Sequence, residues 1–311
     1  MIPANPPTTG MDVSVLVPVY NNAETIAELL DRILAVLSPR AISFEVVIVD
    51  DGSQDDSLGI LQARAAADAR LRVFALTRNF GSQAASCAAC DLARGRRIVH
   101  IDADLENFPE DIPLLLDKME EGFDFVLGYR VERKSPWLTR RLPSRLLNRY
   151  IRRQTKIPIR DAGCGLCGLD ARLIRNLEAE GEARRLMKPM LLRRARRITE
   201  VPVRHRASAK TSGHSMLWLL GIAADYYMLT ARRPFLITGL VAGIVLAAGT
   251  VLICAGAAGA GLISIGVAAL AMLLSLIGEY VQRLYHLAQA RPFYELADRH
   301  PSARPGASAE A

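Results

Sequence analysis

The sequence lacks the features of a cleavable secretory signal. Residues 1–10 are rich in proline and contain neither a basic segment nor the apolar core that precedes a signal cleavage site. This absence argues against export of the chain. We expect the first large domain to stay in the cytosol, after a disordered N-terminus of residues 1–11.

Cysteine is scarce, with five residues in a chain of 311. A reducing cytosol also argues against disulfide bonds as the basis of the fold. Four of the cysteines form two C-x-x-C pairs, Cys87/Cys90 and Cys164/Cys167, and four thiols have the chemistry of a zinc site. The alanine-rich surroundings of Cys87 and Cys90 favour the alternative of a packed helix face.

Charged side chains are absent from residues 234–278. A membrane-spanning helix needs about 20 apolar residues, so this stretch is too long for one span and long enough for two. Small residues at positions 256–261 divide it, which predicts one transmembrane helix over 234–256 and a second over 262–282. A buried helix pair in a soluble core is the alternative, and such a pair rarely has so long an uncharged stretch.

Basic residues flank this predicted hairpin on both sides. Arg232 and Arg233 precede it, and Arg283, His286 and Arg291 follow it. By the positive-inside rule both flanks face the cytosol and the turn faces outward. We therefore predict a two-span protein of the inner (plasma) membrane, with residues 283–311 as a cytoplasmic tail.

Positive charge is in excess, with a formal net charge of +7 at pH 7. Much of it lies in the arginine-rich runs 140–153 and 184–206, which indicates phosphate-bearing partners. Nucleic acid and anionic lipid both carry such phosphates. Because residues 234–278 predict a membrane protein, we expect an anionic membrane as the partner and not nucleic acid. We expect amphipathic helices on the membrane surface over about 138–155 and over 214–232. A solvated basic helix packed on the domain is the alternative for 138–155.

The first 130 residues alternate β-branched segments with amphipathic segments of helical length. Five segments are predicted as strands: 13–19, 44–49, 71–76, 97–101 and 123–127. Strands that alternate with helices form a mostly parallel sheet that is covered on both faces. We therefore predict an α/β domain over residues 12–213.

Polar side chains follow four of these strands, at the carboxyl ends where α/β sheets bind ligands. They are Tyr20, Asn21 and Asn22, then Asp50, Asp51, Gly52 and Ser53, then Asn79, and then Asp102 and Asp104. The four strand ends are expected to converge on one site.

The triplet Asp102-Ala103-Asp104 is the most informative of these sequences. If the strand continues through it, residues i and i+2 face the same way, and the two carboxylates share one direction. A divalent cation removes the repulsion between such carboxylates and gives the pair a function. Glu106 is spaced to join them if the alternation persists. The alternative is an aspartate pair that caps the next helix.

Four ordered motifs together resemble family 2 glycosyltransferases. They are Val17-Pro18-Val19-Tyr20-Asn21, Val49-Asp50-Asp51-Gly52-Ser53, Asn79-Phe80-Gly81 and Asp102-Ala103-Asp104-Leu105. The C-terminal part, with Gly278-Glu279-Tyr280 and Arg291-Pro292-Phe293-Tyr294, is similar to the end of bacterial polyprenyl-phosphate glycosyltransferases that carry two C-terminal spans. The resemblance extends from Asp12 to Arg299.

The resemblance implies a GT-A nucleotide-sugar-binding domain. Its nucleotide-binding residues are expected to be Pro18, Tyr20, Asn22, Val49, Asp50, Asp51, Asn79, Gln83, Asp102 and Ala103. Mg²⁺ or Mn²⁺ is the expected ion, with Asp102, Asp104 and Glu106 as its ligands, because hard oxygen ligands and a diphosphate suit these cations.

The implied reaction is one in-line displacement with inversion, from a nucleotide sugar to a polyprenyl phosphate, and UDP is favoured over GDP. Asp104, Asp161 and Arg130 are the expected catalytic residues, and Asp161 is expected to orient the sugar unless it is an ordinary turn residue. Arg130 and Arg133 are expected to bind phosphate.

One motif departs from the family before the membrane segment. Relatives usually have His, Arg and then Gly-x-Ser-Lys there, whereas this chain has Ser208 and His214 at the basic positions. Arg206, Lys210 or His214 is expected to replace the missing phosphate-binding charges. Glu106 stands where relatives often have glutamine, and Asn107-Phe108-Pro109 replaces Asp-Pro-Pro.

Three other functions compete with this interpretation. Residues 163–168 fit the dinucleotide fingerprint G-x-G-x-x-G, but they do not follow the first strand of a βαβ unit. A processive polysaccharide synthase is the closer rival, yet neither Trp137 nor Trp218 is preceded by the arginine of Gln-x-x-Arg-Trp. A non-catalytic scaffold does not explain acidic residues at the strand ends. A homo-oligomer is compatible with the two-span plan.

Overall fold

The computed structural model describes residues 10–131, 152, 159–161, 163–174, 187–206, 259–288 and 294–297. Several predictions lie outside these residues: the disordered N-terminus except for positions 10 and 11, the helix over 138–155 except for Arg152, the helix over 214–232, the span over 234–256, and the side chains of Arg133, Lys210 and His214. The chain divides into two units, Met1–Leu219 with Pro292–Ala311, and Leu220–Arg291.

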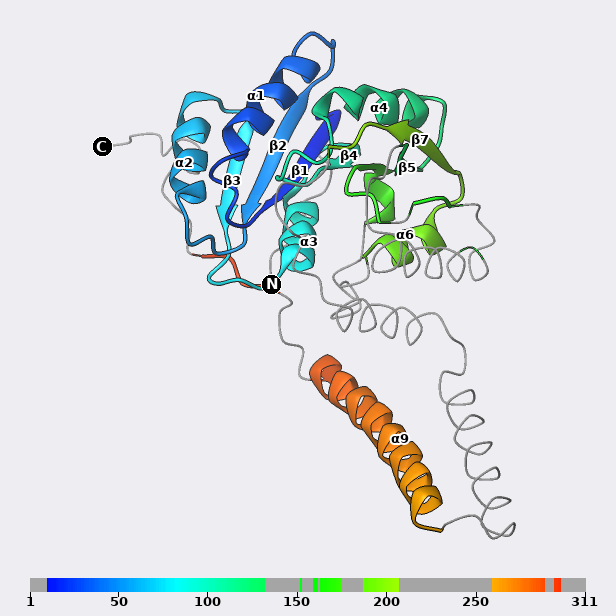
Figure 1. Cartoon of the computed structure of the whole chain (residues 1–311). Coiled ribbons are helices and arrows are strands. Elements are labelled where there is room, and N and C mark those ends of the chain that lie inside the picture. Colours follow the sequence, from blue (N-terminus) through cyan, green and yellow to red (C-terminus); the bar gives the residue numbers. More distant parts are fainter. Residues whose placement is uncertain are drawn as a thin grey trace. The chain divides into compact units, whose positions relative to one another are not determined.

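The first unit is an α/β domain, as the alternation of segments predicted. Its strands are β1 (Val13–Val19), β2 (Phe44–Asp50), β3 (Leu71–Ala75), β4 (Arg97–His100), β5 (Phe125–Arg130), β6 (Cys167–Asp170) and β7 (Ile198–Val203). Its helices are α1 (Ile26–Leu37), α2 (Ser57–Ala67), α3 (Ser82–Leu92), α4 (Ile112–Glu120) and α6 (Met187–Arg194), with short 3₁₀ turns η1 (Pro109–Asp111) and η3 (Ala171–Leu173). Figure 1 shows α1 and α2 beside strands β1–β3.

The described strands form one sheet in the order β3-β2-β1-β4-β6-β5-β7. The pairs among β1–β4 are parallel, and β7 pairs parallel to β5. Strand β6 runs antiparallel to both of its neighbours, β4 and β5. The prediction of a mostly parallel sheet is thus confirmed. The reversed strand β6 in the middle of the sheet was not predicted.

Burial explains why strands β1 and β2 could be predicted from the sequence. Every residue of β1 and β2 is buried, so both strands consist of nearly continuous β-branched segments, as sheets covered on both faces require. Helix α1 buries Ile26, Leu29, Leu30, Ile33 and Leu37 at helical spacing, and Leu34 and Val36 are partly buried beside them. The main core of the domain joins these side chains with those of β4 and α4.

The second unit contains helix α9 (Gly259–Ala288). This helix includes the expected span 262–282 and continues six residues into the predicted tail. Large apolar side chains are exposed along it, among them Ile263, Val267, Leu270, Met272 and Leu274.

In the part of the chain that the structure describes, no helix is both long enough and apolar enough to cross a bilayer.

Candidate active site

The loops that follow β1 and β2 are joined by hydrogen bonds. The Ser53 hydroxyl accepts the amide of Asn21 at 3.0 Å, and the Asn21 side chain accepts the amide of Gln54 at 2.8 Å. Asn21 has φ of 52°, in the left-handed region that asparagine tolerates better than most residues. The two strand ends therefore meet at the carboxyl edge of the sheet, as predicted.

Asp51 connects this edge to the loop after β3. Its two carboxylate oxygens accept the amides of Phe80 and Gly81 at 2.8 and 2.9 Å. Burial raises the pKa of Asp51, although both amide donors act to lower it. Gly52 has φ of +68°, and a Cβ there would lie 2.7 Å from the carbonyl carbon of Arg78. Only glycine allows this close approach of the two loops.

Asp50 is the group at this edge whose bonding is incomplete. Its Oδ2 accepts the amide of Ser53 at 3.0 Å, but its buried Oδ1 has no hydrogen-bond partner among the described residues. An unpartnered buried acceptor costs about 1–3 kcal/mol, which a donor from a bound ligand can recover.

Other residues predicted to bind the nucleotide lie around these loops. Pro18 and Val49 are buried and pair with each other across β1 and β2. Tyr20 is 41% exposed, and Asn79 and Gln83 are also exposed. Tyr20, Asn79 and Gln83 are therefore accessible to a ligand, whereas Pro18 and Val49 are part of the buried sheet below them.

The acidic triplet is a turn, which corrects one premise of its prediction. Strand β4 ends at His100, so the alternation of a strand does not orient Asp102 and Asp104. The turn is held by Thr25, whose hydroxyl donates to the Ala103 carbonyl at 2.7 Å. Leu105 has φ of 57°, an unusual conformation for a branched side chain, and such strain often occurs at functional sites.

Asp104 is the carboxyl group of this turn with the clearest electrostatic perturbation. Burial raises its pKa to about 6, and the nearby charges of Asp102 and Glu106 act in the same direction. The Glu106 amide, which donates to Asp104 Oδ1 at 2.9 Å, acts against the increase. Carboxylates that converge in this way suit a divalent cation, because the cation removes the cost of ionising both.

Asp102 is packed against the backbone of Gly165. A Cβ at Gly165 would lie 1.8 Å from Asp102 Oδ2, so the carboxylate occupies the space that a side chain would need. The loop that carries Gly165 also receives His100, whose Nδ1 lies 2.8 Å from the Gly165 carbonyl. Gly165 is therefore in contact with both Asp102 and His100.

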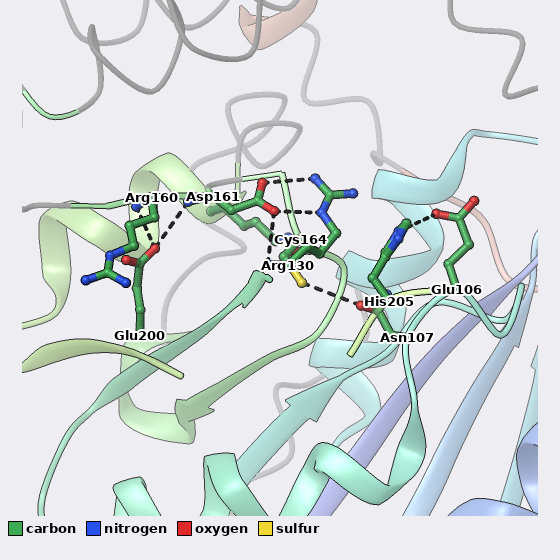
Figure 2. Close-up of polar contacts among 9 residues, drawn as sticks. Glu106, Asn107, Arg130, Arg160, Asp161, Cys164, Glu200 and His205 are labelled. Atoms are coloured by element: carbon green, nitrogen blue, oxygen red, sulfur yellow. Dashed lines mark hydrogen bonds and ion pairs between the residues drawn. The ribbon is translucent and has the colours of Figure 1, made fainter. Parts of the chain in front are cut away.

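Glu106 pairs with His205, as Figure 2 shows, with 3.2 Å between Oε2 and Nε2. The backbone continues this contact, since the Arg206 amide donates to the Glu106 carbonyl at 2.9 Å and a β-bridge joins Asn107 to His205. Arg204 then forms an ion pair with Asp111 at 2.7 Å. The segment after β7 is therefore fixed to the acidic turn, and we call residues 204–206 with residues 106–111 the clasp.

Among the described residues, no group of three or more His, Cys, Asp or Glu side chains is arranged to hold a metal ion. The prediction that Glu106 completes a three-ligand set with Asp102 and Asp104 stays untested. The carboxylates of Asp102 and Asp104 have the hard oxygen chemistry that Mg²⁺ and Mn²⁺ require.

The four cysteines of the two C-x-x-C pairs are buried and form no disulfide bond among the described residues. Burial raises the pKa of Cys164 to about 11 and also raises that of Cys167. Cys87 and Cys90 lie on the buried face of α3, as the packed-helix interpretation predicted.

Arg130 and Asp161 form a buried bidentate ion pair. Arg130 Nε lies 2.6 Å from Asp161 Oδ2, and its Nη2 lies 2.9 Å from Oδ1. Both side chains are only 12% exposed. Glu200 accepts the amides of Arg160 and Asp161 at 2.7 and 3.3 Å and holds this loop in place (Figure 2). Two residues predicted to be catalytic are therefore in contact, and the carboxylate of Asp161 is committed to the guanidinium.

Two residues that sequence reasoning missed support the same loop. Lys188 of α6 donates from Nζ to the Cys164 carbonyl, and buried His100 lies 3.0 Å from the Ser86 hydroxyl through Nε2. Burial lowers the pKa of His100. Neither residue belongs to a motif, because each acts on a loop that is distant in sequence.

Solved structures with a similar fold are glycosyltransferases. Glucosyl-3-phosphoglycerate synthase from Mycobacterium tuberculosis, in complex with Mn²⁺, UDP and phosphoglyceric acid, aligns with a TM-score of 0.55 at 20% identity. The alignment covers 71% of this chain and 79% of that one. The same enzyme in complex with phosphoglyceric acid aligns with a TM-score of 0.53, also at 20% identity, over 71% of this chain and 80% of that one. The sheet and its acidic loops define a GT-A glycosyltransferase fold.

Residues 14–177 match glycosyl transferase family 2, and the chain belongs to this family of enzymes. A protein of Pseudomonas aeruginosa strain LESB58, named undecaprenyl-phosphate 4-deoxy-4-formamido-L-arabinose transferase, is 36% identical over 95% of this chain and 93% of its own length. A protein of the same name from Shewanella sediminis is 32% identical, over 92% of each chain. The resemblance drawn from the motifs is confirmed.

Proposed function

We propose that this enzyme transfers a sugar from a nucleotide sugar to a polyprenyl phosphate at the cytoplasmic face of the membrane. The observation that carries the proposal is the 36% identity over 95% of the chain with a protein named as an undecaprenyl-phosphate sugar transferase. The similarity extends beyond the nucleotide-binding half, which a polysaccharide synthase of the same family would share. The sugar of that name, 4-deoxy-4-formamido-L-arabinose, is the first donor sugar to test.

The donor half of the site consists of the loops after β1, β2 and β3. Asp50, with its unpartnered buried oxygen, and exposed Tyr20 are the groups that we assign to the nucleoside. Asn79 and Gln83 face solvent beside them. We favour UDP over GDP as the nucleotide, on the resemblance of the sequence to bacterial enzymes of this type.

A divalent cation, Mg²⁺ or Mn²⁺, fits the acidic turn. Asp102 and Asp104 would hold it, and when bound it would neutralise charge on the donor diphosphate. The raised pKa of Asp104 supports this assignment, because the isolated protein leaves this carboxylate without a compensating charge.

The reaction that we propose is one displacement at the anomeric carbon. An oxygen of the lipid phosphate forms the new bond to this carbon, the bond to the nucleoside diphosphate breaks, and the configuration inverts. The nucleophile is already anionic, so no general base has to remove a proton. The ion pair of Asp161 with Arg130 agrees with this chemistry, because a carboxylate held by a guanidinium is suited to orient the sugar and not to remove a proton. Arg130 is a candidate for the phosphate through Nη1, the nitrogen that this pair does not use.

The acceptor half is assigned to basic residues, and the described one among them belongs to the clasp. Arg206 is exposed and follows the His205 contact directly, and Arg133, Lys210 and His214 are the other candidates from the sequence. Anchoring in the inner membrane by spans 234–256 and 262–282 is part of the proposal, supported by the uncharged stretch 234–278 and by the exposed apolar side chains of α9.

Transfer of labelled sugar tests this function. The detergent-purified chain would be incubated with undecaprenyl phosphate and a panel of UDP- and GDP-sugars, in manganese, magnesium or chelator, with Asp104→Ala as the inactive control. We expect a chloroform-soluble labelled product from one UDP-sugar that is lost in chelator. Labelled polymer instead of labelled lipid would support the polysaccharide synthase.

A further inference from the structure

Residues 294–297 return to the first unit and pair with the end of strand β3. The Thr77 amide donates to the Glu295 carbonyl at 3.0 Å, and the Ala297 amide donates to the Ala75 carbonyl at 2.8 Å. An antiparallel bridge joins Leu76 to Leu296. Figure 1 shows this short red segment at the end of β3, and we call residues 294–297 the strap.

The strap lies on the edge of the sheet. Strand β3 is the last strand in the order, so its outer backbone groups have no neighbouring strand in the described sheet. Edge strands of this kind are usually covered or shortened, and the strap covers the end of this one. The Tyr294 hydroxyl donates to Asp91 Oδ2 at 2.6 Å, which fixes the strap to α3 as well.

The strap contacts the root of the loop that carries Asn79. Thr77, which it binds, lies two residues before Asn79, and Asp51 holds Phe80 and Gly81 on the other side of the same loop. The loop is thus fixed at both ends, by the Asp51 carboxylate in the loop after β2 and by the C-terminal strap. Without the strap, its first half would keep the hydrogen bond from the Leu76 amide to the Asp50 carbonyl, at 2.8 Å, and the close approach of Arg78 to Gly52.

We propose that the strap is a positioning element of the donor site, with Tyr294 as its anchor. It acts through the loop 76–81 and orders Asn79 before the nucleotide binds. The proposal rests on the proposed function, in which this loop binds the nucleotide.

Two truncations of the full chain test the strap against a matched control. One chain ends at Phe293 and lacks the strap, and the other ends at Ala297 and keeps it. Tyr294→Phe is a milder variant that removes only the hydroxyl. Hydrogen exchange of residues 75–81 measures the order of the loop, and titration with UDP in the presence of manganese measures binding.

We expect the chain that ends at Ala297 to match the wild type in both measurements. The chain that ends at Phe293 should exchange faster at Thr77 and bind UDP about tenfold more weakly, because binding must then order the loop. Tyr294→Phe should weaken binding by about threefold, as loss of one hydrogen bond predicts. In the transfer assay these changes should raise the KM for the donor and leave kcat unchanged, whereas a general loss of folded protein would lower kcat.

Equal rates of hydrogen exchange over residues 75–81 in the two truncated chains would contradict the ordering role of the strap. This conclusion would hold whichever nucleotide the enzyme binds. Faster exchange in the chain that ends at Phe293, in a protein that binds no UDP, would support the ordering role of the strap and refute the proposed donor. The two failures are therefore distinguishable.

Discussion

At the scale of single residues, the acidic turn depends on neighbours that no motif contains. Asp102 is held against the bare backbone of Gly165, and Asp104 has a pKa raised to about 6. The packing of Asp102 on Gly165 is a steric effect, and the raised pKa of Asp104 is an electrostatic effect. Each gives a prediction that a single substitution can test.

Gly165→Ala should disable the enzyme without unfolding it. The new Cβ would lie 1.8 Å from Asp102 Oδ2 and must displace that carboxylate. We expect sugar transfer to fall by about 100-fold, in line with the effect of misplacing a catalytic group by about 1 Å. Gly163→Ala in the same loop is the control, because its Cβ would be 3.5 Å or more from its neighbours. Equal activities of the two variants would contradict the assigned packing.

Asp104→Asn should stabilise the protein at neutral pH while it abolishes transfer. The folded pKa of about 6 exceeds the ordinary value of 3.8, so the unfolded chain loses this proton first as the pH rises. The free energy of unfolding therefore decreases between about pH 4 and pH 6, and asparagine avoids that loss. In chelator, the Tm of the variant should exceed that of the wild type at pH 7.5 and equal it near pH 3.5. A lower Tm at pH 7.5 would contradict this sign.

At the scale of secondary-structure elements, the site is built by contacts between the ends of elements. Arg130 at the end of β5 meets Asp161 in the loop before β6, and the segment after β7 meets the turn after β4 in the clasp. The ring of Phe108 contacts two guanidinium groups of the same region, with its centroid 5.3 Å from Arg32 Cζ and 5.1 Å from Arg204 Cζ. These contacts join loops that follow or precede four different strands of the sheet.

Asp161→Asn should destabilise the first unit by about 3 kcal/mol, because it leaves the buried Arg130 guanidinium without its counter-charge. Urea unfolding followed by circular dichroism measures this loss. The exposed pair of Arg64 with Asp31 is the control, and Asp31→Asn should cost less than about 1 kcal/mol. In the double variant Arg130→Met/Asp161→Leu, stability should recover and transfer should stay absent. Recovery of transfer would show that the pair is only structural.

Glu106→Ala and His205→Ala should have matching effects, because each removes one side of the same contact. We expect both to raise the KM for the lipid phosphate by about tenfold, since the loss of a hydrogen bond to a charged group costs about 1.5 kcal/mol or more. The manganese concentration for half-maximal transfer should not change. Glu106→Gln, which can still bond His205, is the control and should keep most of the activity. A higher manganese requirement in Glu106→Ala alone would identify Glu106 as a metal ligand.

At the scale of the whole molecule, the enzyme has two units with different surfaces. The first is an α/β domain with a buried core, whereas α9 of the second exposes a series of large apolar side chains. Exposed apolar surface of this extent marks a partner or a lipid phase. Membrane attachment is the proposal that accounts for it.

Carbonate extraction at high pH should leave the wild-type chain in the membrane pellet. The double variant Leu270→Arg/Leu274→Arg should move it toward the soluble fraction, because each arginine at the centre of a span costs about 2.5–3.5 kcal/mol of insertion. Leu114→Arg is the control, since Leu114 is a leucine of the first unit that is 43% exposed. A double variant that stays in the pellet like the wild type would contradict anchoring through α9.

The sequence by itself determined the α/β class, the first five strands, the acidic loops and the family. The fifth strand was predicted at 123–127 and lies at Phe125–Arg130. These features depend on local patterns, because a buried parallel strand must be apolar throughout and a functional loop begins where such a strand ends. Strands β6 and β7 escaped prediction. Cys167–Asp170 is too short to show the alternation of apolar and polar residues that marks a strand. Residues 163–168, which overlap its start, fit the dinucleotide fingerprint instead. Residues 198–203 lie at the end of an arginine-rich run.

Only the tertiary structure decided which groups meet. Asp161 and Arg130 are 31 residues apart, Glu106 and His205 are 99 apart, and Tyr294 is 203 residues from Asp91. No local pattern encodes such pairs, because each contact depends on the order of strands in the sheet and on where the loops cross it. The same holds for Gly165, whose requirement for a missing side chain exists only because the fold brings Asp102 against it.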